Sequence, residues 1–552
     1  QIGTYYFSEE SFDDFYFGKG SSYPDINGAI GILFEQSRVN GQVVNNRYGK
    51  TSFAEAIRNQ FTVSLSTINA SMEMKEELVD YQKSFYAEIP NLSKDDAIKA
   101  FSFGCKEDPV KLSNFLNVLD LHQIDVYKNN NRIKINNTIF EPGESYLVPL
   151  QQNQYRLIKS MFAKQTEFKD SLFYDISTWN FPFAFNIDYK EIQNEKISLG
   201  NKVENPNEIK TIPTNKSNIG YLFSWTNYNA PKLLYQLQQK GIIVRVVTKP
   251  TEVIVQEKKL QFSYGSIFIP VSKQTISSEE LYYILNNLAL KTGVKVTGVE
   301  SGYRNTGLHL GSSNLVPLKT PKTLMLIGNG INSRQAGEIW HLMDYRMDIF
   351  LTRVDQDRFN RINLFDYNTL ILPDGDYSFT KNKMEEIQIW LKNGGNIITI
   401  GESVLTFKDQ INITKREVEK TDTTIRKNYI LTDELRRQNR INGVILQADV
   451  DITHPIGYGL NKTKIPVFRN NNYVMEKTNN PYSTPVFISN ELLSGYLNNK
   501  SLSYISNSAY INSYSLGEGH IIAFTDNPNF RAIWFGTNKL FLNSIFFGQI
   551  IR

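Results

Sequence analysis

The sequence predicts an α/β protein built from several units. Short apolar runs of strand length alternate with longer segments in which apolar residues recur every three or four positions, as in helices. One order of strand, helix, strand, glycine turn, strand and helix occurs at 101–163 and again at 221–291. From about residue 319 onward, strands and helices alternate in the way typical of a parallel doubly wound sheet.

Size and composition indicate a globular chain with more than one core. The 552 residues are several times the usual domain length of about 100 to 200 residues. Hydrophobic residues make up 41% of the chain and charged residues 21%, which provides enough apolar material for packed interiors and too little charge for a disordered chain. We therefore expect several packed domains.

Charge and cysteine content exclude several classes of protein. The net charge of +4 is spread along the chain without a basic block, so no nucleic-acid partner is expected. Cys105 is the only cysteine, which excludes an intramolecular disulfide and a Cys-rich metal site. No apolar run approaches the roughly 20 residues that span a bilayer, so no transmembrane segment is expected.

The first expected unit covers residues 1–95. A glycine-rich turn leads into the apolar run 30–34, which predicts a buried strand that ends at Glu35. From Thr51 to about Tyr86, apolar residues recur at four-residue spacing and predict a long helix. A carboxylate at the end of an apolar strand beside a glycine-rich loop is a candidate general base. The alternative is a solvent-facing carboxylate that pairs with Arg38 or Arg58.

The two copies of the repeated pattern predict two small α/β units, at 96–165 and 218–316. Gly143 in the first copy matches Gly265 in the second, and the pair Val148-Pro149 matches Ile269-Pro270. The segment between them, 166–217, is expected to be a linker with extended stretches and a polar loop. We expect the two units to pack as pseudo-equivalents.

The last unit, 317–552, is predicted to be a doubly wound domain of flavodoxin type. The run at 323–328 reads as a buried strand that enters a glycine turn, and strands and helices alternate up to about residue 401. The stretch from about 410 has many strand-like runs and ends in a probable helix at 539–551, so we expect it to complete or flank the sheet.

The stretch FYFGKGSSYPDINGAIGILFEQSRVNG at 15–41 resembles the end of the catalytic domain of carboxypeptidase A-like zinc peptidases, in a bacterial branch with long C-terminal extensions. Further segments with the same resemblance include 322–346 and 530–547, so the likeness extends over nearly the whole chain. It implies that Glu35 is the general base that activates zinc-bound water and that Tyr16 is a substrate clamp. It also implies a peptide or protein substrate and a secreted, periplasmic or outer-membrane-associated location.

The zinc ligands of that family lie upstream of its catalytic glutamate, as an H-x-x-E pair and a further histidine. This chain has no histidine before Glu35 and no H-x-x-E; only H-x-x-D occurs, at His122 and His341. A catalytic zinc needs three protein ligands, and two isolated matches on separate domains do not supply them. We expect no metal or cofactor site in this chain, with zinc held only by a full-length family member.

The doubly wound unit resembles glutamine amidotransferase-like domains, whose nucleophilic cysteine sits on a sharp strand-to-helix turn. The matching turn here is 400–403, and it contains no cysteine. Ser403 with His454 and Asp451 could form a nucleophile, a base and an orienting group, but Leu405 stands where a G-x-S-x-G elbow requires glycine. The alternative is a degenerate structural domain.

Two functions follow from these features. The chain is either the C-terminal portion of a secreted or envelope zinc metallocarboxypeptidase, which hydrolyses C-terminal residues from peptides with its zinc ligands outside this chain, or a non-catalytic binding or scaffold subunit of an outer-envelope complex derived from such a peptidase. The expected partner is the missing catalytic half in the first case and an envelope protein in the second. If 1–95 is part of a larger domain, its apolar strand should be poorly buried within this chain.

Overall fold

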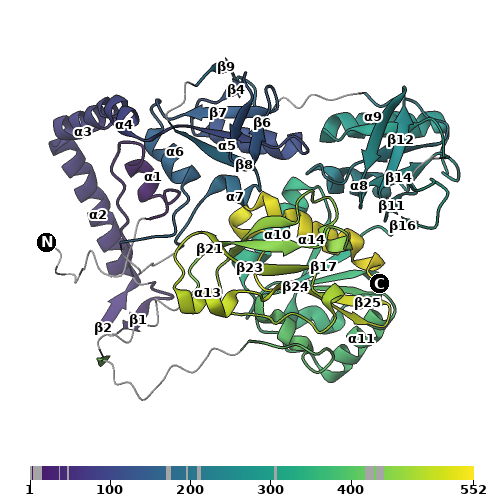
Figure 1. Ribbon diagram of the computed structural model, residues 1–552. Helices are drawn as coiled ribbons and strands as arrows, with labels where there is room; N and C mark the ends of the chain where they lie inside the picture. The colour runs from purple at the N-terminus through teal and green to yellow at the C-terminus, as the bar shows by residue number, and fades with distance from the viewer. Residues whose placement is uncertain are drawn as a thin grey trace.

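The computed structural model contains three α/β units and an N-terminal helical arm (Figure 1). Each unit has its own sheet, which confirms the expected α/β class. None of the helices in the described part of the chain is long and apolar enough to cross a membrane. The structure describes residues 3, 6, 15–36, 38–46, 49–169, 176–193, 197–207, 213–303, 307–416, 428, 429 and 440–552.

The N-terminal arm is mostly helical. A capping box starts its longest helix, because the Ser52 side chain accepts the Glu55 backbone N–H and the Glu55 carboxylate accepts the Ser52 backbone N–H. The helix expected at 51–86 therefore begins near the predicted place, but it breaks at Met74 into two pieces. The elements are α1 (Ser22–Asp25), β1 (Val43–Asn46), β2 (Gly49–Ser52), α2 (Phe53–Glu73), α3 (Lys75–Ala87) and α4 (Ile89–Asp95).

The prediction of a buried strand at 30–34 is wrong. These residues are extended but belong to no strand, and Ile32 and Leu33 are 58% and 59% exposed. A strand needs a neighbour to take up its backbone hydrogen bonds, and the described part of the chain supplies none here. Glu35 therefore does not end a strand; it lies exposed in irregular chain.

The first α/β unit has a five-stranded sheet in the order β8-β3-β7-β4-β9. The segment 166–217, expected to be a linker, supplies β8 and β9 to this sheet, so the unit continues well past residue 165. The strands are β3 (Ile98–Gly104), β4 (Tyr127–Asn129), β7 (Ser145–Pro149), β8 (Asp188–Gln193) and β9 (Leu199–Lys202), with a hairpin of β5 (Ile133–Ile135) and β6 (Thr138–Phe140). The helices are α5 (Pro109–Leu121), α6 (Tyr155–Phe162) and α7 (Phe181–Ala184).

The second unit repeats the first. Its sheet order, β15-β10-β14-β11-β16, matches the first sheet position by position, and each unit carries one extra two-stranded hairpin. The expected repeat is confirmed, and Gly143 and Gly265 both have positive φ, at 74° and 80°. The strands are β10 (Gly220–Phe223), β11 (Arg245–Val247), β12 (Thr251–Val255), β13 (Lys258–Phe262), β14 (Ile267–Pro270), β15 (Val296–Val299) and β16 (Leu315–Pro317). The helices are α8 (Ala230–Gln239) and α9 (Ser278–Thr292).

The third unit has a nine-stranded sheet in the order β18-β17-β19-β20-β25-β24-β23-β21-β22. Its first five strands in that order are parallel and follow the flavodoxin-type order 2-1-3-4-5, as expected, and the other four are antiparallel. The strands are β17 (Thr323–Ile327), β18 (Leu351–Asp355), β19 (Thr369–Leu372), β20 (Asn396–Ile400), β21 (Val444–Val450), β22 (Lys464–Arg469), β23 (Val486–Ser494), β24 (Ala509–Leu516) and β25 (Gly519–Phe524).

Helices cover this sheet, and short helical turns connect its elements. The α-helices are α10 (Ser333–Trp340), α11 (Lys381–Lys392), α13 (Asn499–Ile505) and α14 (Phe535–Phe547). A π-helical turn follows α10 at His341–Arg346. The 3-10 turns are Gln356–Arg361, Leu364–Asp366, Gly401–Phe407, Pro455–Gly457, Pro481–Ser483, Phe530–Ala532 and Gly548–Ile550.

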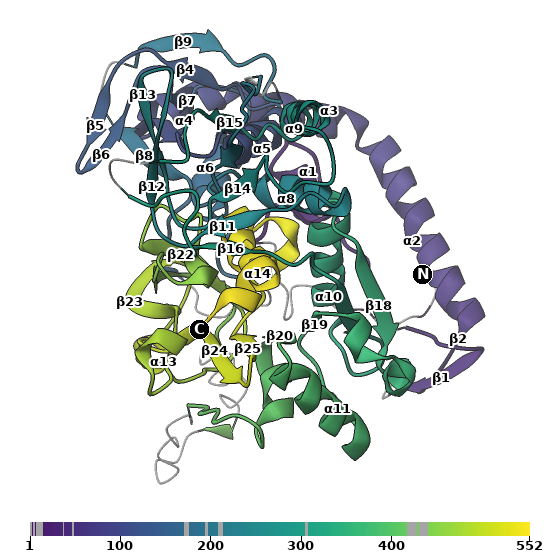
Figure 2. The same cartoon turned by 90° about the vertical axis from the view of Figure 1, so that its right-hand side faces the viewer.

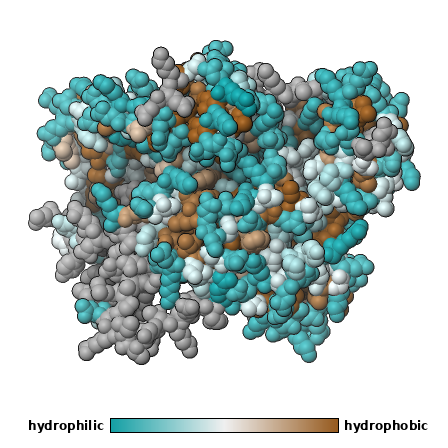
Figure 3. All heavy atoms as spheres, in the orientation of Figure 1, coloured by the Kyte–Doolittle hydropathy of each residue, from teal (hydrophilic) through white to brown (hydrophobic). Residues whose placement is uncertain are grey.

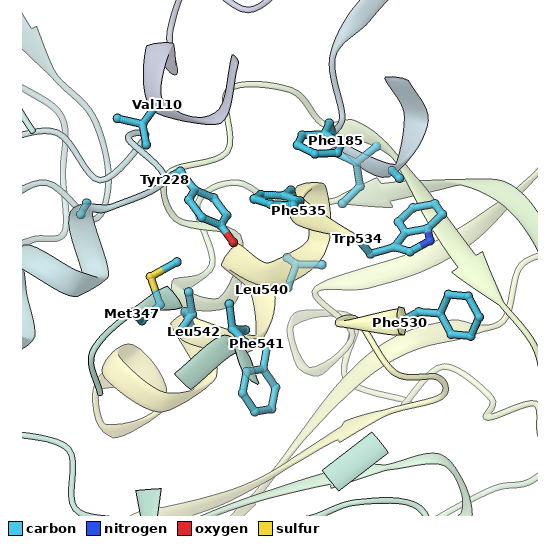
Figure 4. Close-up of a cluster of buried hydrophobic side chains, with 14 of the residues drawn as sticks. Val110, Phe185, Tyr228, Met347, Phe530, Trp534, Phe535, Leu540, Phe541 and Leu542 are labelled. Carbon is cyan, nitrogen blue, oxygen red and sulfur yellow. The ribbon is translucent and has the colours of Figure 1, made fainter. Parts of the chain in front are cut away.

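Helix α14 joins the three units. Every residue of this helix is buried, and Figure 4 shows its side chains among residues from the first and second units. The Phe535 ring stacks on Phe185 of the first unit with centroids 4.2 Å apart. The Tyr228 hydroxyl of the second unit donates to Asn538 over 2.8 Å. A helix buried on all sides must be covered by more than one layer, so the units are held around α14.

Asn543 in α14 carries three hydrogen bonds between units. Its Oδ1 accepts Trp225 Nε1–H over 2.6 Å, and its Nδ2 donates to the carbonyls of Ile456 and Tyr458 over 2.7 and 2.8 Å. Both Asn543 and Trp225 are completely buried, so water does not replace these partners.

We expect Asn543→Ala to lower the free energy of unfolding by at least about 2 kcal/mol, because it leaves three buried polar groups unpaired. Chemical denaturation followed by tryptophan fluorescence measures the change. Asn91→Ala, on an exposed turn of α4, serves as the control and should change stability by less than about 0.5 kcal/mol. An equal effect of the two substitutions would contradict the assigned role of Asn543.

Candidate functional site

The two residues expected to form a peptidase site lie in different surroundings. Glu35 is exposed. Tyr16 is partly buried and stacks on Trp179 with ring centroids 3.4 Å apart and planes 20° apart, so its ring packs against the first unit. Glu35 lies in neither a cavity nor a strand end that would hold it against a reacting bond.

The histidines in H-x-x-D positions are also separated. His122 ends α5, and its Nδ1 lies 2.7 Å from the Tyr23 hydroxyl. His341 begins the π-helical turn of the third unit, where its ring stacks on Tyr345. Within the described ranges, no group of three or more His, Cys, Asp or Glu side chains is arranged to hold a metal ion.

Ser403, His454 and Asp451 do not form a catalytic triad. The Ser403 Oγ is completely buried, accepts the Ile400 N–H over 3.0 Å and donates to the Ile400 carbonyl over 2.8 Å, so it fastens the turn that follows β20. Asp451 accepts hydrogen bonds from the backbone and side chain of Thr453. These bonds occupy the groups that nucleophilic catalysis would need.

His454 lies at the opposite edge of the sheet from Ser403. It is close enough to His520 for their charges to interact, and His520 pairs with Asn396 at the start of β20, whereas Ser403 follows the end of that strand. The His454 Nδ1 accepts the Ile456 N–H over 3.1 Å, and burial lowers the pKa of His454 to about 4. This histidine is a neutral cap of the turn 455–457.

The carboxyl edge of the parallel strands is where doubly wound folds place their ligands. Here two loops at that edge close on each other. The Asp376 N–H donates to the Gly330 carbonyl over 3.0 Å, and a side chain at Gly375 would come within 2.6 Å of the same oxygen. Asp374 accepts the Glu402 N–H over 3.0 Å, and burial raises the pKa of Asp374. The edge is rigid and acidic, with its loops bonded to one another.

The loop after β25 contains the strongest local strain. Arg531 and Ala532 have φ of 45° and 56°, in the left-handed region that non-glycine residues avoid. Glu338 on α10 holds this loop, because its carboxylate accepts the Arg531 N–H over 2.7 Å and a hydrogen bond from the Asn527 side chain. Burial raises the pKa of Glu338 to about 7. Backbone strain is often kept where function requires it, but here it joins α10 to the turn that begins α14.

A small cavity lies where the three units meet. It is lined by the turns before α5 and α8 and by the start of α14, and its volume of about 30 Å³ has room for about one water molecule. The Lys539 ammonium donates to the carbonyls of Trp225 and Asn227, both over 2.7 Å, and burial lowers the pKa of Lys539 to about 7. The polar groups here hold the units together and leave no space for a substrate.

Sequence reasoning missed Glu338 and Lys539. Both lie in ordinary helical sequence, and their unusual environment comes from burial between segments that are far apart along the chain. No local signal in the sequence marks them. In contrast, the feature described next was visible in the sequence as a four-residue spacing of apolar residues.

Helix α2 exposes its apolar side. Six side chains on one face of the helix, here called the α2 apolar face, are between 46% and 72% exposed, and no residue of α2 is buried. Asn59 and Val63 on the other side are partly covered. The orientation is the reverse of that of an ordinary surface helix, whose apolar stripe faces the core. The face consists of Phe53, Ile57, Phe61, Leu65, Ile68 and Met72.

The views agree that α2 stands at the side of the molecule. Its neighbours along the chain are β2 at its start and α3 at its end (Figures 1 and 2). Figure 3 shows hydrophobic patches among the mainly hydrophilic residues of this view. The exposed run 30–34 adds four more large apolar side chains, each 47% to 59% exposed. Together they form the candidate functional surface.

Comparisons with known proteins add little about function. No family model and no curated protein match the chain. Similar solved structures include a ThuA-like protein from Parabacteroides merdae ATCC 43184, with 12% identity, 41% of this chain and 89% of that chain covered, and a TM-score of 0.29. Another is a ThuA-like protein from Bacteroides uniformis ATCC 8492, with 12% identity, 40% and 88% coverage, and a TM-score of 0.24. A beta-galactosidase from Bacillus circulans sp. alkalophilus matches at 10% identity, 40% and 30% coverage, and a TM-score of 0.26.

These findings correct the resemblance to carboxypeptidase A-like zinc peptidases. The solved structures found are ThuA-like proteins and glycosidases, and no carboxypeptidase appears among them. The segment 15–41 misled because a glycine-rich turn, an apolar run and a glutamate are common local features, and here they form no strand. Peptide hydrolysis, zinc dependence through a full-length chain and a secreted or envelope location depended on that resemblance, and they stay predictions.

The stability of the protein should depend on the protonation of Glu338. The folded state keeps the proton up to about pH 7, whereas the unfolded chain releases it near the usual value of 4.5. The contribution of Glu338 to the free energy of unfolding therefore falls as pH rises from about 4.5 to about 7, by an amount of the order of 3 kcal/mol. In Glu338→Gln this fall should disappear, so wild type and variant should differ in slope across that range.

Urea denaturation at pH 5, 6, 7 and 8 measures the two slopes. Glu385→Gln, on the exposed side of α11, is the matched control and should follow the wild-type profile. Parallel profiles for wild type and Glu338→Gln would show that the carboxyl is ionised in the folded protein throughout.

Proposed function

We propose that this chain is a non-catalytic binding or scaffold component of a protein complex, and that the α2 apolar face is the surface through which it acts. The observation that carries this proposal is the outward direction of the apolar stripe. An exposed apolar face of this size on a folded protein marks an interaction site, because leaving it in water costs free energy that binding recovers.

The amount of surface supports a specific interface. The six residues of the α2 apolar face and the four apolar residues of 30–34 together expose about 1,100 Å², taking about 200 Å² for a fully exposed side chain of this kind. A standard protein–protein interface buries about 800 Å² on each partner. The surface is therefore large enough for a stable complex.

The rest of α2 supports the same conclusion. Only Glu55, Arg58 and Glu73 carry charge among its 21 residues. Four hydroxyl side chains satisfy themselves by donating to the carbonyl four residues earlier, at distances of 2.7 to 2.9 Å. A helix with few charges and self-satisfied hydroxyl groups loses little on leaving water, which suits an element covered by a partner. These residues are Thr62, Ser64, Thr67 and Ser71.

A double substitution on the face tests the proposal. In extracts of the cells that make the protein, wild type should elute from gel filtration well above its 63.5 kDa monomer mass. Ile57→Asp combined with Phe61→Asp should return the chain to the monomer position without lowering its melting temperature, because the two residues are 55% and 63% exposed. Desolvating two carboxylates against an apolar partner would weaken binding at least about 100-fold.

Ser66→Asp is the matched control, since it adds a charge to the same helix at an exposed position outside the face. It should leave the elution position unchanged. A wild-type chain that elutes as a monomer at its natural concentration would contradict the proposal, and so would a double variant that still elutes with the complex.

A further inference from the structure

The extended run 30–34 lies beside the middle of α2. The Gln60 side-chain amide donates to the Phe34 carbonyl over 3.4 Å, which joins the end of the run to the helix two turns after its start. At its other end, the Gly31 N–H donates to the Asp25 carboxylate over 2.7 Å. The run is therefore held next to the helix while its side chains are exposed.

The backbone of this run is open as well. Among the described residues, no backbone–backbone hydrogen bond involves Ile32 or Leu33, although the chain is extended at both. An extended segment with free backbone groups and apolar side chains is a template for pairing with another strand. Buried without such pairing, each backbone group would cost about 1 to 3 kcal/mol, so any partner that covers the side chains must also bond the backbone.

We infer that 30–34 and α2 together complete a β-sheet of a partner polypeptide, the run as an added strand and the helix as a cover for one sheet face. The inference rests on the proposed function and names the class of partner: a protein with an unpaired sheet edge and an uncharged apolar face next to it. Strand addition supplies main-chain bonds, and the α2 apolar face supplies hydrophobic contact.

A sheet fits this surface better than a lone helix. A partner helix in contact with α2 would cover its apolar face, but all of its backbone groups are used internally, so it would leave Ile32 and Leu33 unpaired. An apolar sheet face with an open edge satisfies both elements at once. The partner's contact area must carry no charge, because the α2 apolar face offers none to pair with it.

A second copy of this chain fits less well. Two copies that meet through this surface around a two-fold axis would pair one run with the other and form only two strands. An isolated pair of strands is marginally stable in water, and three or more strands are needed for an independent layer. The partner therefore brings its own sheet.

Site-specific photo-cross-linking tests the inference. Benzoylphenylalanine replaces Leu33 in one variant and Ile57 in another, and the full chain is irradiated in the cells that make it naturally. Cross-linked peptides are identified by mass spectrometry. Both positions should cross-link to the same polypeptide, in peptides from outside residues 1–552, with the Leu33 probe on an edge strand and the Ile57 probe on the neighbouring sheet face.

The same probe at Ser66 is the matched control, and its yield should be at least about 10-fold lower, because Ser66 lies on α2 outside the face. Cross-links to a second copy, to lipid or to a helix of the partner would overturn the inference. They would leave the proposed function standing if the chain still elutes in a large complex. Absence of cross-links together with monomeric elution would overturn both.

Discussion

The burial of α14 is the constraint on which the rest of the structure depends. All of its residues are buried, including three polar ones, Asn538, Lys539 and Asn543, whose hydrogen bonds reach other parts of the chain. A helix in this position needs cover on every side, which the third sheet alone does not give. The first and second units provide the remaining cover, through Phe185 and Trp225. The three α/β units are thus one packed body.

The same rule gives α2 its meaning. Helix α14 shows that this chain covers apolar helices where it can, and the α2 apolar face is the exception. Its exposed stripe, its few charges and the open backbone of the neighbouring run 30–34 are three independent properties of an element made for burial. The protein therefore has a closed body with buried and satisfied polar groups, and one side that is incomplete without a partner.

Local patterns predicted most of the fold. The repeat at 101–163 and 221–291 and the doubly wound unit were visible because strand and helix periodicities depend on neighbouring residues. The strand at 30–34 was predicted wrongly, since a strand also needs a pairing partner that local sequence does not show. The strands β8 and β9 were missed inside an apparent linker for the same reason. Their place in the first sheet depends on residues about 90 positions away or less, such as the pairing of Phe103 with Tyr189.

The candidate sites were less predictable than the fold. Ser403 and His454 looked compatible in sequence, but spacing along the chain does not say which edge of a sheet a residue reaches, and they lie at opposite edges. Glu338 and Lys539 have shifted pKa values because tertiary packing removes them from water, and their local sequence is unremarkable in composition. The α2 apolar face was present in the sequence as a helix pattern, and only the structure showed that it points outward.

Hydroxyl-radical footprinting of α2 tests the central claim most directly. Met72 and Phe61 are the most exposed apolar residues of the face, at 72% and 63%, and both side chains oxidise readily when water reaches them. In the purified chain they should be oxidised rapidly, and in the complex from the natural source their oxidation should fall at least about 10-fold, while that of the exposed Tyr482 stays the same. Equal oxidation of Met72 and Phe61 in both samples would contradict the account, because the face would then remain in water in the working protein.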